Sequence, residues 1–214
     1  GLCSNKRALL FSSESSSDEV ISRLLSNKLS IPSWSFRRFN FTEQDKQTLE
    51  ESKTSISAWP LSICDKARPS IEDVEFGIRR LQPDIVFLDY IQRCVSGHDM
   101  YEQLKDWMVA LKSFAKLYNI PVIVASQINR ESKKDGSSPG LHHLLGSGSL
   151  EQEADNVIIL DRKDDSQTNE VIVTAHLCKG RNCGTGKYIL KLNTDYLQFT
   201  EMPKDGQMKQ EIPT

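Results

Sequence analysis

The segment PDIVFLDYIQR, residues 83–93, is the most informative part of this chain for its fold class. Four apolar residues, Ile85 to Leu88, form a run typical of a buried strand, and the run ends abruptly in Asp89. In open sheets of parallel strands, ligands bind beyond the carboxyl ends of the strands. A carboxylate at that position can face a metal ion or a reacting water molecule while the apolar run stays in the core.

Two further apolar runs end in a polar side chain in the same way. RALLFSSE (7–14) ends in Glu14, and IPVIVASQ (120–127) ends in Gln127. Each of these tips, taken alone, is also what a strand shows where it reaches the surface. Together they predict a nucleotide site, in which Asp89 holds Mg²⁺, Glu14 activates the attacking water and Gln127 donates a hydrogen bond to the γ-phosphate.

The remaining pattern predicts an α/β fold with a mainly parallel sheet flanked by helices. Predicted helices begin at three N-cap residues, Ser16, Thr42 and Ser70, and the clearest helix spans 101–119. The C-terminal third changes to closely spaced strands, which predict hairpins and an antiparallel edge; these strands are 156–161, 170–178, 187–193 and 196–201. Residues 129–149 lack periodicity and predict a long loop, and long loops inside compact domains are usually functional or mobile.

Composition favours one domain of a soluble globular protein, with 214 residues, 38% hydrophobic and 26% charged. We expect the domain to cover 1–202, to begin within a fold, and to be followed by a disordered tail, 203–214. No signal peptide or membrane-length apolar run is visible, and five scattered cysteines favour reduced thiols. The net charge of −2 argues against coating of duplex nucleic acid, but it allows a few local contacts to one strand.

A phosphate-binding P-loop has the pattern G-x-x-x-x-G-K-[ST]. The sole Gly-Lys pair of the sequence is Gly186-Lys187, which has Arg181 five positions before its glycine and Tyr188 after its lysine. The 214 residues therefore contain no P-loop.

Five segments in order carry a family resemblance: LLFSSE (9–14), PDIVFLDYIQ (83–92), IPVIVASQINR (120–130), GSGSLEQEADNVIILDR (146–162) and CKGRN (178–182). They resemble the RecA-like motor domain of DnaB-type replicative helicases, superfamily 4 enzymes related to phage primase-helicases and the mitochondrial helicase Twinkle. The resemblance implies a RecA-like fold and an ATP-dependent DNA helicase that works in replication on single-stranded DNA.

The resemblance also implies roles for individual residues. Glu14 matches the catalytic glutamate, Asp89 the Walker B aspartate that holds Mg²⁺ through water, and Gln127 the γ-phosphate sensor. Lys179 and Arg181 match a basic pair that reaches the ATP of the neighbouring subunit. The channel loops that contact DNA match the segments containing Arg93, Arg130, Lys133, Lys134, Gly146 and Gly148.

Further expectations follow for the complete protein. The resemblance implies a hexameric ring, a primase and a helicase loader as partners, and the cytoplasm with its nucleoid as location, the mitochondrial matrix being the alternative. The family's Walker A strand and loop precede the matched segments, so the chain is expected either to be a piece lacking them or to have lost nucleotide binding. Two other functions stay open: a RecA-fold recombinase-like ATPase and a non-hydrolysing RecA-fold adaptor.

Overall fold

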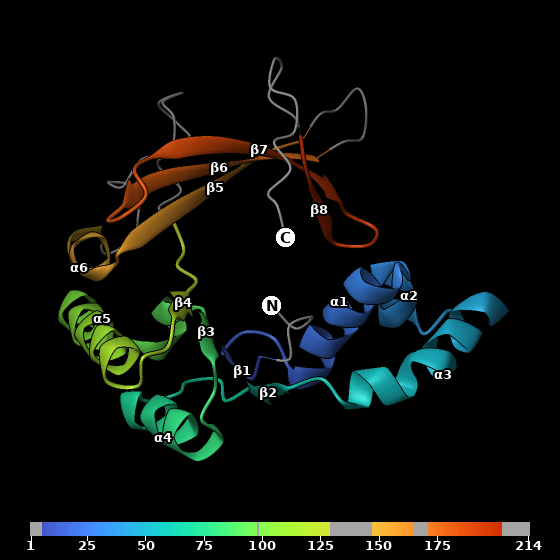
Figure 1. Cartoon of the computed structure of the whole chain (residues 1–214), viewed down its shortest axis with the longest axis horizontal. Helices are drawn as coiled ribbons and strands as arrows, with labels where there is room; N and C mark the ends of the chain where they lie inside the picture. The colour runs from blue at the N-terminus through green and yellow to red at the C-terminus, as the bar shows by residue number, and fades with distance from the viewer. Residues whose placement is uncertain (1–5, 98, 129–146, 165–170, 203–214) are drawn as a thin grey trace.

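The computed structural model describes residues 6–97, 99–128, 147–164 and 171–202 (Figure 1). The N-terminal half contains β1 (Ala8–Ser12), α1 (Ser17–Leu29), α2 (Ser33–Arg38), α3 (Glu43–Ser57), β2 (Leu61–Cys64), α4 (Ile71–Leu81), β3 (Ile85–Asp89) and the short 3-10 helix η2 (Ile91–Cys94). The rest contains α5 (Met100–Leu117), β4 (Val122–Val124), α6 (Ser147–Glu153), β5 (Asn156–Asp164), β6 (Val171–Gly180), β7 (Gly186–Asn193) and β8 (Gln198–Glu201).

Strands β1 to β4 form a parallel sheet in the order β2-β1-β3-β4. Parallel neighbours need a crossover, and the helices between successive strands provide it. The register places Ser12 opposite Asp89, and Leu88 opposite Val124. The carboxyl ends of β1, β3 and β4 therefore meet at one edge of the sheet, which we call the carboxyl edge.

The hydrophobic core lies between this sheet and the helices α4 and α5. Its buried side chains come from both layers and include Leu9, Phe11, Val74, Ile78, Val86, Leu88, Leu104, Trp107 and Leu111. On the opposite face of the sheet, Leu10 and Phe87 are partly buried and Ile123 is 50% exposed. The helices of the described chain thus cover this face less completely than the sequence predicts.

Strands β5 to β8 form a second, antiparallel sheet in sequence order (Figure 1). Its ladder has an irregularity between Val157 and Ile158. The predicted α/β fold with parallel strands followed by antiparallel ones is confirmed. The antiparallel strands make a sheet of their own rather than extending the edge of the parallel sheet.

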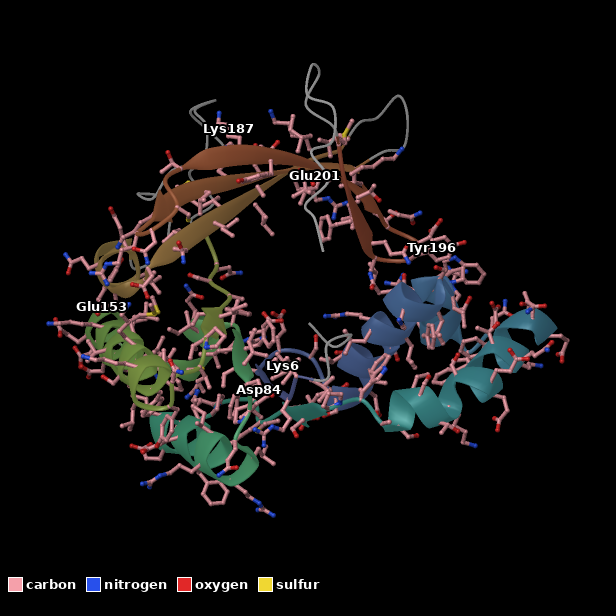
Figure 2. All side chains as sticks on the ribbon, viewed as in Figure 1. Lys6, Asp84, Glu153, Lys187, Tyr196 and Glu201 are labelled. Atoms are coloured by element: carbon pink, nitrogen blue, oxygen red, sulfur yellow. The ribbon has the colours of Figure 1, made fainter. Side chains whose placement is uncertain are left out.

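Among the residues that the structure describes, two joints connect the second sheet to the rest of the chain. At one, α6 packs against α5, and Lys112 of α5 forms an ion pair with Asp155, just before β5. At the other, the turn between β7 and β8, which contains Tyr196, lies beside α1 and α2 (Figure 2). There the Ser33 amide donates a hydrogen bond of 2.7 Å to the Asp195 carbonyl.

One difference from the sequence-based expectation concerns the end of the predicted 129–149 loop. Helix α6 begins at Ser147, so the last three residues of the predicted 129–149 loop are helical. Residues 129–146 and the predicted tail, 203–214, lie outside the described residues. None of the described helices has the length and apolar character that crossing a bilayer would require.

Candidate functional site

Glu14 and Asp89 lie side by side at the carboxyl edge, because hydrogen bonds join the segment after β1 to the end of β3. The Ser13 amide and hydroxyl both donate to the Asp89 carbonyl oxygen, at 2.8 and 3.0 Å. The Ser12 hydroxyl donates to the Ser15 carbonyl at 2.7 Å, which closes the turn that carries Glu14. The glutamate side chain is exposed at this turn.

The electrostatics of Asp89 show that the two carboxylates interact. Burial raises the pKa of Asp89, the negative charge of Glu14 raises the pKa further, and the guanidinium of Arg23 partly opposes both effects. Carboxylate oxygens are preferred Mg²⁺ ligands, and a divalent cation beside this pair would relieve the repulsion. Within the described residues, no group of three or more His, Cys, Asp or Glu side chains forms a metal cluster.

Gln127 is held at the same edge through Gln92, a residue of η2. The Gln92 side chain accepts from the Gln127 amide at 3.1 Å and donates to the Ser126 hydroxyl at 2.8 Å. The Ile91 amide adds a hydrogen bond of 3.1 Å to the Ala125 carbonyl. These bonds fix the segment after β4 against the segment after β3, while the Gln127 side chain remains exposed.

Sequence reasoning does not single out Gln92 or Arg23. Gln92 stands three residues after Asp89 in the segment 83–93, so its position after a strand end is an available signal. Arg23 lies on α1 and affects Asp89 only through the tertiary fold, so the sequence holds no comparable signal for it.

The predicted basic pair makes contacts within its own chain. Lys179, on β6, donates to the carbonyls of Glu151 and Gln152 at 2.6 and 3.3 Å, at the end of α6. Arg181 follows β6 and donates from Nη1 to Asp155 Oδ1 at 2.9 Å. These bonds lie at the junction of α6 and β5 and do not involve Glu14, Asp89 or Gln127, and the predicted connection of the pair to a nucleotide runs between subunits.

The predicted DNA-contacting residues are partly described. The Arg93 guanidinium lies 5.9 Å from the centre of the Tyr90 ring, at the end of η2. Gly148 is exposed in the first turn of α6, with open space where a side chain would stand. The other four, Arg130, Lys133, Lys134 and Gly146, lie outside the described residues.

A parallel α/β sheet with two carboxylates and an amide at its carboxyl edge belongs to the class of α/β proteins that bind ligands at this edge. Comparison with known proteins gives the family within that class. The DnaB-like helicase C-terminal domain family matches residues 2–201. The chain therefore belongs to the DnaB-like helicase C-terminal domain family.

Individual relatives agree with this assignment. The chain is 30% identical over 209 residues to a replicative DNA helicase DnaB of Leifsonia xyli and 32% identical over 218 residues to one of Mycobacterium leprae. These alignments cover 91% and 94% of this chain but 45% and 36% of the relatives, so the chain spans less than half of their length.

Solved structures show the same fold. A solved ATPase domain superposes with a TM-score of 0.85 at 26% identity, covering 94% of this chain and 76% of that chain. A DnaB-like replicative helicase, whose structure was described together with its interactions with primase, superposes with a TM-score of 0.85 at 26% identity, covering 94% of this chain and 52% of that one.

Proposed function

We propose that this chain is the RecA-like motor part of an ATP-dependent replicative DNA helicase, in which hydrolysis at subunit interfaces drives translocation on single-stranded DNA. The observation that carries the proposal is the meeting of Glu14, Asp89 and Gln127 at one sheet edge, in a chain of the DnaB-like family. The raised pKa of Asp89 supports it, because repulsion between neighbouring carboxylates suits a site that receives a cation.

In this proposal each residue at the edge has a separate task. Asp89 would hold Mg²⁺ through water, and bound Mg²⁺–ATP would supply the phosphoanhydride and the charge neutralisation of phosphoryl transfer. Glu14, exposed beside Asp89, takes the proton of the attacking water. Gln127 donates its side-chain amide to the γ-phosphate, and the hydrogen bond from its backbone to Gln92 keeps it at the edge.

The same proposal assigns Lys179 and Arg181 to the ATP of a neighbouring subunit in a hexameric ring. Single-stranded DNA would pass by Arg93, Gly148 and the residues of the predicted 129–149 loop. The solved relative that interacts with primase favours a primase as partner, and a loader would place the ring on DNA. The relatives reported above are bacterial, which favours the bacterial cytoplasm and its nucleoid over the mitochondrial matrix.

Nucleotide binding in this proposal requires a phosphate loop, and residues 1–214 contain no G-x-x-x-x-G-K-[ST] pattern. A complete protein that binds ATP has to supply such a loop from outside these residues. A full-length protein that binds no ATP would instead be the non-hydrolysing adaptor, and one that hydrolyses ATP without separating strands would be the recombinase-like ATPase.

The test is ATPase activity of the full-length protein with and without single-stranded DNA, together with unwinding of a forked duplex. We expect Glu14→Gln to lower kcat by about 100-fold or more, because general-base catalysis contributes on the order of 10²–10⁴. Binding of a fluorescent ATP analogue should survive. Glu50→Gln is the matched control, because Glu50 lies on the exposed helix α3 and pairs only with Lys53 among the described contacts. Unchanged turnover in Glu14→Gln would remove the assigned role.

A further inference from the structure

Arg181 is held at two points by one residue, Asp155. Its Nη1 donates to Asp155 Oδ1 at 2.9 Å, and its backbone amide donates to the Asp155 carbonyl at 2.9 Å. The backbone contact fixes the main chain at Arg181, and the side-chain contact fixes one nitrogen of its guanidinium. The direction in which Arg181 extends is therefore set by Asp155.

Asp155 is in turn anchored to the parallel-sheet half of the molecule. Its other oxygen, Oδ2, forms an ion pair with Lys112 of α5. Lys112 and Arg181 together lower the pKa of Asp155, with the Lys112 hydrogen bond as the largest cause, so the carboxyl stays ionised at neutral pH. Glu153 marks this corner, where α6 meets α5 (Figure 2).

The exposure of the pair argues for orientation rather than stability. The Arg181 side chain is 67% exposed and that of Asp155 46% exposed. Ion pairs this accessible contribute little to folding. A guanidinium, however, has five donors in a rigid planar fork, so one nitrogen can be held while the others bind a phosphate. Groups held in this way are pre-organised for the reaction they serve.

We propose that Asp155 is a positioning residue that orients the Arg181 guanidinium toward the nucleotide of the neighbouring subunit. The inference rests on the function proposed above. Asp155 contacts no nucleotide itself, and it acts on turnover through Arg181 alone. Lys112 anchors Asp155 from the opposite oxygen and leaves the contact between Oδ1 and Arg181 in place.

The experiment measures steady-state ATPase of the full-length protein in the presence of single-stranded DNA. We expect Asp155→Asn to lower kcat by about 10-fold with KM nearly unchanged, the size usual for loss of an orienting partner. Asp155→Glu, which keeps the charge, should recover part of the loss. Lys105→Gln is the matched control: it removes an exposed ion pair of helix α5, with Glu102, and should keep kcat within about twofold. Thermal melting of every variant separates loss of turnover from loss of folded protein.

A double-variant cycle decides whether the effect runs through Arg181. Once Arg181→Gln has removed the guanidinium, Asp155→Asn should lower kcat no further. An equal loss from Asp155→Asn with and without Arg181 would overturn the positioning role while leaving the helicase proposal intact. Unchanged turnover in Arg181→Gln would overturn the role of Arg181 in the proposed function, and the positioning role with it.

Discussion

At the scale of a single residue, the surroundings of Asp89 disfavour the charged form of its carboxyl. Asp89 is exposed at the end of β3, but partial burial of its carboxyl, together with the Glu14 charge, raises its pKa. The folded protein therefore holds the proton more tightly than the unfolded chain does. Between the unfolded pKa, about 3.9, and the higher folded pKa, folding takes up a proton, so the free energy of unfolding falls as pH rises through this range.

Asp89→Asn should therefore stabilise the protein in EDTA at pH 7. We expect a rise in Tm of about 2 °C, because relief of a solvent-accessible repulsion is worth less than about 1 kcal/mol. The gain should shrink as pH falls toward the range where the wild-type carboxyl is protonated. Differential scanning calorimetry between pH 4 and 8 measures it, and the variant should lose ATPase activity.

Asp84 is the matched control for this measurement, because it precedes the same strand, near Lys6 (Figure 2). The backbone amide of Arg7 donates to its carboxylate at 2.7 Å, and this bond is the main cause that lowers the pKa of Asp84. Asp84→Asn should lower Tm at pH 7, the opposite sign. A fall in Tm for Asp89→Asn as well would mean that the carboxylates at the edge do not repel in solution.

The site residues that the sequence predicts differ from those that it does not predict in how far apart along the chain their contacts lie. Glu14, Asp89 and Gln127 each end a recognisable apolar run, so a local pattern identifies their positions. The position of Gln92 after a strand end is a local signal, but its contact with Ser126 spans 34 positions and that of Asp155 with Arg181 spans 26, and the sequence pattern shows neither contact.

Helix starts show the same division at the scale of elements. Complete capping boxes open α1, α3 and α4, at the three N-cap residues that the sequence predicts, because the box is a contact between residues three apart. The local pattern does not predict helix α6, because this helix begins with Ser-Gly-Ser, which has low intrinsic helix propensity. Its stability comes from tertiary contacts: Leu150 is buried, and Lys179 of β6 donates to the carbonyls at its end.

At the scale of elements, the close packing of α4 on β1 predicts that a larger residue at Gly77 destabilises the fold. A β-carbon added at Gly77 would lie 3.1 Å from both Leu9 Cδ2 and Phe11 Cζ, two core side chains. Gly77→Val should lower stability by about 2 kcal/mol through overpacking, or about 6 °C in Tm. Urea unfolding with an unchanged m-value measures the loss. Gly148→Val is the control, since among the described residues no atom beyond its own helix backbone and chain neighbours would lie within 4 Å of an added β-carbon. Equal losses for the two variants would rule out overpacking as the cause.

At the scale of the whole molecule, the two sheets are joined at separated places. One joint is the contact of Lys112 and Arg181 with Asp155, and the other is the turn between β7 and β8 against α1 and α2. Since the proposed mechanism assigns the carboxyl edge to one sheet and the basic pair to the other, these joints fix the relation between the two halves of the proposed machinery. Neither joint is visible in the sequence, because each connects segments far apart in the chain.

The second joint depends most directly on Asn27. The side-chain amide of Asn27 donates to the Leu197 carbonyl at 2.7 Å, and the backbone carbonyl of Asn27 accepts from the Gln198 side chain at 2.7 Å. Asn27→Ala removes only the first bond, so we expect a loss of about 1 kcal/mol, or about 3 °C in Tm. Loosening of the turn should also release the Ser33 amide from the Asp195 carbonyl.

Hydrogen exchange of the full-length protein separates loosening of this joint from global destabilisation. The Ser33 amide should exchange faster in Asn27→Ala, whereas the Ala125 amide, bonded to the Leu88 carbonyl between β3 and β4, should be protected as in the wild type. Gln47→Ala on α3, which removes only an exposed contact with Glu51, serves as the control. Faster exchange at both amides would show that the two sheets unfold as one unit, and unchanged exchange at Ser33 would show that Asn27 does not hold the joint.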